Sequence, residues 1–420
     1  MHLSRIATFL LILALVPAGS ADAFSVPERR KPQFEKELGY YVFPMPYSLP
    51  GIGDGLAAVG AAMNVGGTYT DLLGFGLTGD MKGGGLVTKD VHLLPELLVL
   101  DVTFERFSKA TLTSYGQRGM NTDKHDYSYL ELGSVDFLAS RFTATFLERR
   151  IELFGGAYAF SSSLERLLDN EGTEILVVTD PQVNRNRITT VGTRIDVTDD
   201  YADPRKGTRL EISRWYSPPR SDNNADYYFM EYNANAYFPL GRRNTLILNA
   251  FRSDAHVTRQ GETDRTVVNV QEGLNCHTLL DPEQMSECWK VVDNIVEANT
   301  YGTVGSLGGT SRLRSYPHDR FTAAHALFYG AEFRWNLTEE RQPFDIVIMK
   351  DIRTVWQAAF FYEAGTVADR RDELGDVWRS SYGVGLRMVT ASGIVFRADV
   401  ASGKEGVEAS IIVGYPWEAL

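Results

Sequence analysis

The chain has 420 residues, and its 54 acidic and 42 basic side chains give a net charge of -12 at pH 7. This acidic balance argues against nucleic acid as a partner, because a polyanion binds to basic surfaces. With 20 Tyr, 22 Phe and 38 Gly, the composition fits an exported β protein with polar loops.

The first 23 residues are predicted to be a cleaved secretory signal. A short basic start with His2 and Arg5 precedes an apolar core over 6–16 and a small-residue exit over 20–23. Beyond this segment no run approaches the roughly 20 apolar residues that a membrane-spanning helix needs. The exported chain could therefore cross a bilayer only as a closed β-barrel.

Residues 24–53 are expected to form a short periplasmic lead-in, and residues 54–420 a barrel domain. The lead-in is too small to build a core of its own. Alternating apolar and polar residues then predict eleven strands. They span 56–65, 72–78, 84–94, 97–107, 127–136, 141–149, 153–163, 188–197, 208–216, 228–238 and 245–253.

Five further strands follow in the C-terminal third, over 327–335, 356–363, 382–388, 394–400 and 407–417. In the last of these, every second residue from Val407 to Trp417 is apolar, so Trp417 is expected on the outer face as the closing aromatic residue. The total is about sixteen, an even number that brings both ends of the chain to one side of the barrel.

A soluble β-sandwich would show the same alternation of apolar and polar residues. Two features favour a transmembrane antiparallel barrel: aromatic residues at the ends of segments of roughly 10 residues, and charges on the opposite face. Short turns such as 203–207, 239–241 and 391–393 also alternate with longer polar loops such as 217–226 and 369–376. This asymmetry is typical of outer-membrane barrels.

A long insertion over about 257–321 contains both cysteines of the chain, Cys276 and Cys288. In an exported protein a local disulfide is the favoured interpretation. A metal site that includes the adjacent His277 is the alternative, but it lacks a fourth ligand nearby, so no metal or other cofactor is expected.

The insertion ends in Arg312-Leu313-Arg314-Ser315-Tyr316, which resembles the arginine-glycine-aromatic loop motif of the BamA/TamA outer-membrane assembly superfamily, the bacterial surface antigen family. Ser315 occupies the position of the family's glycine. Other segments resemble that family's motifs in the same order. They are 196–200 with 203–208, Ala331-Glu332-Phe333-Arg334, Phe361-Tyr362-Glu363-Ala364-Gly365-Thr366-Val367, Tyr382-Gly383-Val384-Gly385-Leu386-Arg387 and Gly414-Tyr415-Pro416-Trp417.

The resemblance implies a sixteen-stranded barrel whose long extracellular loop folds into the lumen, where Arg314 holds it. Period-two parity directs Glu332 and Glu363 into the lumen, at positions where the family places acidic partners. A guanidinium can bind such carboxylates bidentately. The alternative is that Arg314 is a solvated loop residue and that both glutamates line a wet lumen.

The resemblance also implies a bacterial outer-membrane protein that acts in assembly or transfer of membrane proteins or lipids, here without the family's periplasmic polypeptide-transport-associated domains. Its partners would be outer-membrane lipid and other molecules at the seam between the first and last strands, with the protein itself a monomer. The alternative is a passive pore with a loop in its lumen. No nucleophile elbow, paired-histidine motif or phosphate loop indicates an enzyme.

Overall fold

The computed structural model describes residues 38–241, 243–338, 344–346, 349–352, 354–390 and 394–417. The expected signal peptide over 1–23, the start of the lead-in and the turn at 391–393 lie outside these ranges. Within them, no helix combines the length and the apolar character needed to cross a bilayer.

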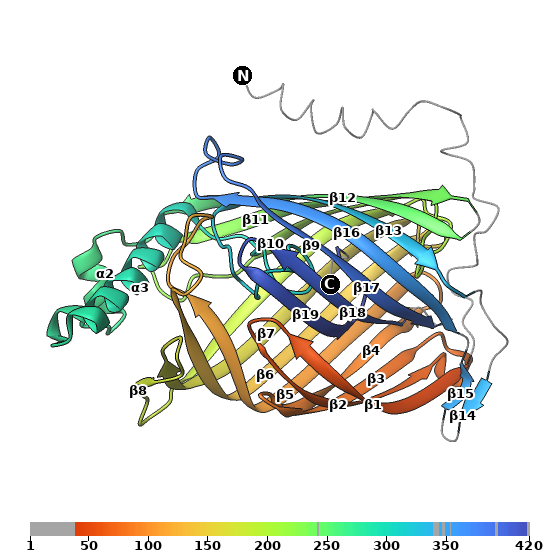
Figure 1. Cartoon of the computed structure of the whole chain (residues 1–420), viewed down its shortest axis with the longest axis horizontal. Coiled ribbons are helices and arrows are strands. Elements are labelled where there is room, and N and C mark those ends of the chain that lie inside the picture. The colour runs from red at the N-terminus through yellow and green to blue at the C-terminus, as the bar shows by residue number, and fades with distance from the viewer. Residues whose placement is uncertain are drawn as a thin grey trace.

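The chain forms a closed antiparallel β-barrel of sixteen strands, as predicted (Figure 1). The short strands β8 (Glu174–Val177), β14 (Phe344–Ile346) and β15 (Met349–Ile352) extend connections between barrel strands. The barrel strands are β1 (Gly39–Leu49), β2 (Gly53–Met63), β3 (Asp71–Gly79), β4 (Lys82–Leu94), β5 (Leu98–Tyr115), β6 (Tyr127–Phe146), β7 (Ile151–Leu168), β9 (Val183–Asp196), β10 (Gly207–Tyr216), β11 (Asp226–Leu240), β12 (Asn244–Arg259), β13 (His325–Asn336), β16 (Thr354–Ala368), β17 (Arg379–Thr390), β18 (Val395–Gly403) and β19 (Gly406–Val413).

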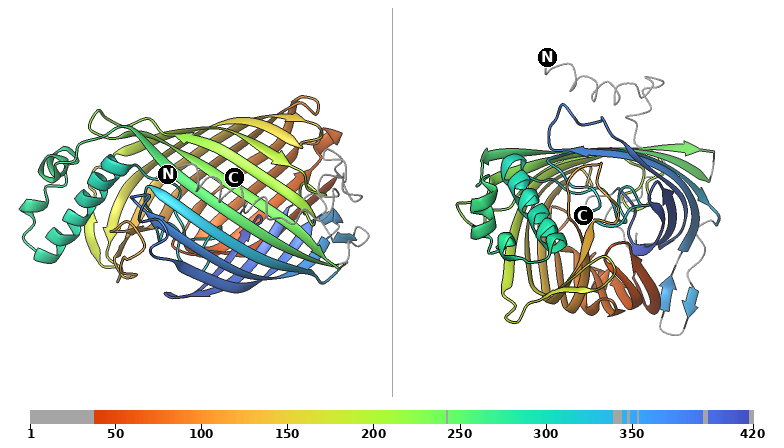
Figure 2. Two further views of the ribbon diagram at one scale, coloured as in Figure 1. Left: turned by 90° about the horizontal axis from the view of Figure 1, so that it is seen from above. Right: turned by 60° about the vertical axis from the view of Figure 1, so that its left-hand side comes forward.

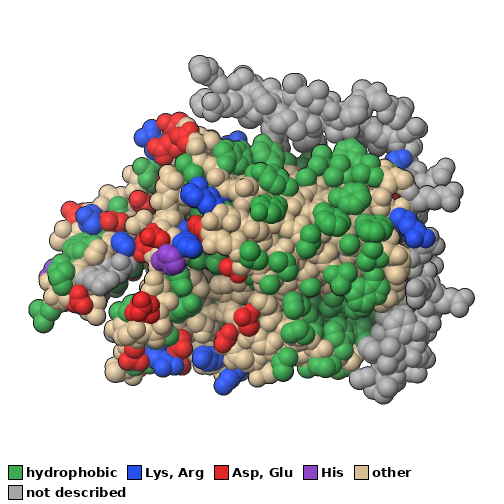
Figure 3. All heavy atoms as spheres, in the orientation of Figure 1, with side chains coloured by type: hydrophobic (Ala, Val, Ile, Leu, Met, Phe, Trp, Pro, Cys, Tyr) green, Lys and Arg blue, Asp and Glu red, His purple; other side chains and the backbone are tan. Residues whose placement is uncertain are grey.

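Successive side chains alternate between the outside and the inside of the barrel. On β17, Tyr382 and Val384 are 57% and 51% exposed, whereas the neighbouring Arg387 is fully buried. On the side of the barrel shown in Figure 3, apolar side chains cover much of the surface, and most charged side chains lie toward the end that carries the helices. The predicted pattern of an apolar outer face and a polar inner face is therefore confirmed for β17.

The strands differ from the prediction in two places. One strand is additional and two expected strands form a single one, so the total remains sixteen. The segment expected as a lead-in contains β1, which pairs with β2 along its whole length. Pro44 and Pro46 obscure this strand, because proline cannot donate to a strand ladder and is confined to edges. The segments expected as separate strands over 127–136 and 141–149 form the single strand β6.

The connections divide between two ends of the barrel. The termini end, where β1 begins and β19 ends, has several short turns, such as 95–97 and 147–150. Two longer connections lie there as well, 197–206 between β9 and β10 and the β13–β16 connection that carries β14 and β15. The loop end has longer connections, and the longest of them joins β12 to β13 over 260–324. The view from the loop end shows coil segments inside the ring of strands (Figure 2).

The barrel closes through a very short ladder between its first and last strands. Ser48 and Ile411 are the paired residues of β1 and β19, and the Ser48 hydroxyl donates to the carbonyl of Ala409 at 3.1 Å. By contrast, β18 pairs with β19 over eight residue pairs. Backbone hydrogen bonds therefore hold this seam far more weakly than its neighbours.

A barrel whose strands are paired all round should resist detergent until it is heated, because opening it breaks many backbone hydrogen bonds at once. We expect the folded protein to migrate faster than the boiled protein in a gel containing dodecyl sulfate. A single band at the same position with and without boiling would contradict the barrel.

Candidate functional site inside the barrel

The β12–β13 connection has a helical part outside the barrel and a coil part inside it. The helical part, which projects from the loop end, comprises α2 (Arg265–Gln271), the 3-10 helix η3 (Cys276–Thr278) and α3 (Pro282–Tyr301) (Figures 1 and 2). A disulfide joins Cys276 to Cys288, with the two Cα atoms 5.5 Å apart. This bond lies within the helical part, so it does not fasten the segment inside the lumen.

The coil part, residues 302–324, enters the barrel and packs against its wall. Leu307, Leu313, Tyr316 and Phe321 are completely buried and belong to one apolar cluster with Phe328 of β13. Burial of these side chains removes apolar surface from water and fixes the path of the chain between them. We call residues 302–324 the inner segment.

Arg314 lies at the centre of a buried ionic network in the inner segment. Its side chain is 1% exposed and contacts three carboxylates. The guanidinium donates to Glu363 at 2.9 Å through Nε, to Asp399 at 2.7 Å and to Glu332 at 3.3 Å. The backbone N–H of Arg314 also donates to Glu363 at 2.9 Å. The structure thus places Arg314, Glu332 and Glu363 together.

The three acids come from three different strands, β13, β16 and β18, so the network ties the inner segment to a broad section of the wall. Period-two alternation over 394–400 also directs Asp399 inward, but this alternation alone does not identify Asp399 as a partner of Arg314. Further arginines complete the network. Arg334 and Arg387 each donate to Glu332 at 2.7 Å, and Arg397 donates to Asp399 at 3.3 Å.

Removing charges from water is costly, and good geometry is needed to offset that cost. Here the ring of Phe361 stacks under the Arg314 guanidinium, 3.4 Å from its central carbon to the ring centroid. Such an arrangement contributes little net stability compared with apolar packing, but loss of one partner leaves a buried charge uncompensated. The network therefore specifies one position of the inner segment strongly.

The other residues of the loop motif also contact the barrel wall. The Arg312 guanidinium lies 3.7 Å from the centroid of the Phe251 ring, and the Tyr316 hydroxyl donates to the carbonyl of Ser380. The Ser315 N–H donates to the Ser381 hydroxyl at 3.0 Å. A side chain on Gly403 would collide with the Ser315 hydroxyl, so a glycine on the wall makes room for this serine.

The expectation that Trp417 closes the last strand on its outer face is wrong. Strand β19 ends at Val413, and Gly414 and Trp417 both have positive φ, so the chain turns inward. Trp417 is 1% exposed, and its indole N–H donates to Glu363 at 2.8 Å. The alternation of apolar and polar residues runs on to Trp417, although β19 ends at Val413. The alternation therefore does not show where the strand stops.

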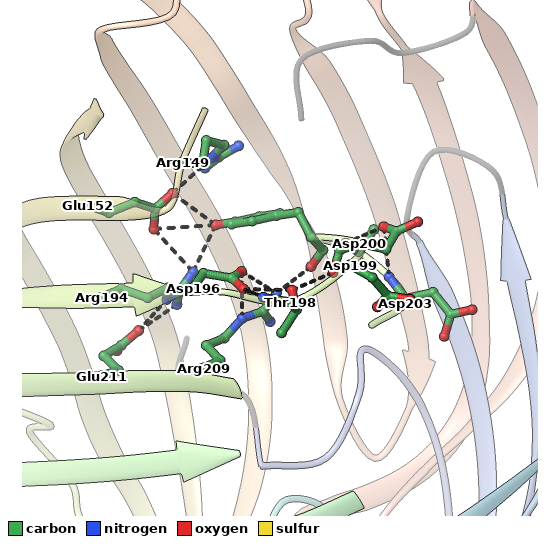
Figure 4. A network of polar contacts seen from close by, with 12 residues as sticks. Arg149, Glu152, Arg194, Asp196, Thr198, Asp199, Asp200, Asp203, Arg209 and Glu211 are labelled. Carbon is green, nitrogen blue, oxygen red and sulfur yellow. Dashed lines mark hydrogen bonds and ion pairs between the residues drawn. The ribbon is translucent and has the colours of Figure 1, made fainter. Parts of the chain in front are cut away.

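A second polar network lies at the termini end, around the connection between β9 and β10 (Figure 4). Arg194 donates to Glu211 at 2.7 Å and to the Tyr201 hydroxyl at 2.8 Å, and that hydroxyl donates to Glu152 at 3.2 Å. Burial raises the pKa of the Tyr201 phenol, so it stays protonated and remains a donor. Arg209 of β10 donates to Asp196 at the end of β9 at 3.0 Å and to the carbonyl of Tyr201 in the connection at 2.6 Å.

The C-terminal tail connects the two networks. The Tyr415 hydroxyl donates to Asp203 of the β9–β10 connection at 2.7 Å, and Gln357 of β16 donates to the same carboxylate at 3.1 Å. Two residues later, Trp417 reaches Glu363. The tail therefore bridges the turn at the termini end and the partners of Arg314.

Neither network has the composition of a metal centre. Among the described residues, no group of three or more His, Cys, Asp or Glu side chains could hold a metal ion. The carboxylates around Arg314 are engaged by arginines and by Trp417, which suits positioning of a segment.

Replacing Arg314 by Ala should destabilise the folded barrel by about 3–5 kcal/mol, because three carboxylates would lose their central cation. The measurement is the temperature at which the heat-modifiable form is lost. Exposed Arg370, which pairs with Asp372, is the control, since Arg370→Ala removes an ion pair in solvent and should leave that temperature unchanged.

Adding Glu363→Gln to Arg314→Ala should restore part of the loss, because it removes one of the uncompensated charges. Equal transition temperatures for wild type and Arg314→Ala would contradict a structural role for the network.

Comparisons with known proteins place these features in a family. The model of the Omp85 superfamily domain matches residues 179–405. No curated protein sequence matches the chain. Solved structures with a similar fold include CdiB from Escherichia coli, at 11% identity and a TM-score of 0.50, over 90% of this chain and 62% of that one.

Two other structures have lower scores. BamA from Haemophilus ducreyi lacking POTRA domains 1–3 has 12% identity and a TM-score of 0.45, over 90% of this chain and 70% of that one. CdiB from Acinetobacter baumannii has 11% identity and a TM-score of 0.47, over 90% and 60%. The chain thus spans about three fifths of each CdiB chain. Because the family model matches more than half of the 420 residues, the chain belongs to the Omp85 superfamily and is a β-barrel protein of the bacterial outer membrane.

Proposed function

We propose that this barrel transfers or assembles a membrane protein or lipid through the seam between β1 and β19. The observation that carries the proposal is the short ladder there, where Ser48 and Ile411 are the paired residues. Opening this seam breaks few backbone hydrogen bonds, whereas separating β18 from β19 disrupts a ladder of eight pairs. A lateral opening is therefore easiest at this place.

Side-chain packing takes over where the ladder ends. The Phe396 ring of β18 contacts Tyr41 and Phe43 of β1, with ring centroids 5.8 and 4.9 Å apart. Such contacts are less directional than a strand ladder and can reform after separation. They support a seam that is closed at rest and able to open.

In this proposal the termini end faces the periplasm and the loop end faces the outside of the cell. Short turns at one end and longer loops at the other follow the asymmetry of outer-membrane barrels. The helical part with its disulfide would then be extracellular, a compartment in which disulfides persist.

A reversible lock tests the proposal. Ser48→Cys with Ile411→Cys would place two cysteines opposite each other across the seam. In the source bacterium, with this variant as the sole copy, we expect loss of the outer-membrane barrier to detergents and large antibiotics under oxidising conditions. Reductant should restore the barrier, because it frees the seam while the barrel remains folded.

The matched control is Val384→Cys with Val400→Cys, which joins β17 to β18 within a full ladder on the exposed face. This lock should leave the barrier intact. A seam lock that forms completely and has no effect on the barrier would overturn the proposal.

The inner segment weighs against the alternative of a passive pore. Arg118 and Arg320 tie the inner segment to other connections at the loop end. Arg118 donates to the carbonyl of Gly302 at 2.7 Å and to Asp369 at 2.6 Å. Arg320 donates to Glu405 and to the carbonyl of Thr122. Together these contacts brace the segment inside the mouth of the barrel.

We therefore expect the wild-type protein to give small, infrequent currents in planar lipid bilayers, and Arg118→Ala with Arg320→Ala to increase them by loosening the segment. Arg370→Ala again serves as the control. Large, steady currents from the wild-type protein would favour the pore.

A further inference from the structure

The middle part of the inner faces of β1, β2 and β3 is apolar, with Asp71 as the inward charge at the start of β3. The lumen of a membrane barrel is ordinarily polar. On β13, β16 and β18 the inner wall follows that rule, since these strands carry Glu332, Glu363 and Asp399. On the first three strands, two rows of directly paired residues contain no charge. These rows are Phe43, Val59 and Phe75, and Met45, Ala57 and Leu77.

Strand pairing fixes which side these rows occupy. Ser410 of β19 is buried and paired with Asp399, which faces the lumen, so the adjacent Ile411 and its partner Ser48 face outward. Odd-numbered positions of β1 therefore face inward. Phe43 and Met45 on β1, and Phe75 on β3, are only half-buried, so they retain surface that a ligand can cover.

This inner wall is continuous with the lipid-facing surface across the seam. Phe396 of β18 is paired with Met388 of β17, and both belong to the outward set of their strands. Yet Phe396 packs against the inward side chains Tyr41 and Phe43 of β1. At the termini end, the outer face of the last strands therefore meets the inner face of the first without a ladder between β1 and β19, while β15 pairs with β1 at one position, Tyr40 with Lys350.

We infer that the inner wall of β1–β3 binds an acyl chain of a membrane lipid, which enters through this part of the seam. The two rows offer apolar contact and no charge, which suits a hydrocarbon chain. A polypeptide segment would bring backbone N–H and C=O groups that these side chains cannot satisfy. The inference goes beyond the proposed transfer, because binding requires no client and no opening cycle.

The test uses the purified full-length protein in vesicles of phosphatidylethanolamine and phosphatidylglycerol, with a small share of a phospholipid that carries a diazirine on its acyl chain. After illumination, fragmentation mass spectrometry assigns the labelled residues. We expect adducts on inward Phe43, Met45 and Phe75 as well as on outward Val42 and Leu56. Adducts confined to the outward residues would overturn the inference.

Phe75→Ser should reduce labelling of Met45 by about fivefold to tenfold, the factor expected when a large apolar contact is lost. The matched control is Leu56→Ser, which removes an exposed outward side chain and should leave Met45 labelling unchanged. Both variants are compared only after each shows the heat-modifiable shift of the folded barrel. Equal labelling of Met45 in Phe75→Ser and Leu56→Ser would also overturn the inference. The labelling results do not depend on the disulfide lock between β1 and β19. Acyl-chain binding and transfer through the seam can therefore be contradicted separately.

Discussion

The buried guanidinium of Arg314 is the constraint on which the rest of the interior depends. A cation removed from water must be matched by fixed carboxylates, and here β13, β16 and β18 each provide one. Their joint geometry admits one position of the inner segment. The apolar side chains on either side of Arg314, Leu313 and Tyr316, are then buried against the wall as a result.

The same network extends to the C-terminal tail. Trp417 shares Glu363 with Arg314, and Tyr415 reaches Asp203 in the turn between β9 and β10. The last strand is therefore attached at its C-terminal end to the interior of the barrel, while its free edge meets β1 at a short ladder. The ladder between β19 and β1 has a single pair of residues and is the weaker of the two attachments, and it lies on the side of the barrel wall.

Sequence reasoning could predict much of this fold because period-two alternation reports directly which face of a strand is buried. It placed Glu332 and Glu363 on the inner face correctly, and the resemblance implied Arg314 as their partner. It missed β1, whose two prolines are tolerated at a barrel edge, and misplaced Trp417, because alternation cannot show where a strand stops. The contact between Phe396 and Tyr41 joins distant residues, and no local pattern encodes it.

The positions of Arg314 and its partners along the chain also have a consequence for folding. Asp399, which completes the surroundings of Arg314, lies 85 residues further along the chain. Arg118 similarly bonds to Asp369, 251 residues away. Docking of the inner segment therefore requires contacts of high sequence separation, which form slowly. Docking and closure of the barrel are thus coupled, because Asp399 lies on β18, the strand that pairs with β19 beside the seam.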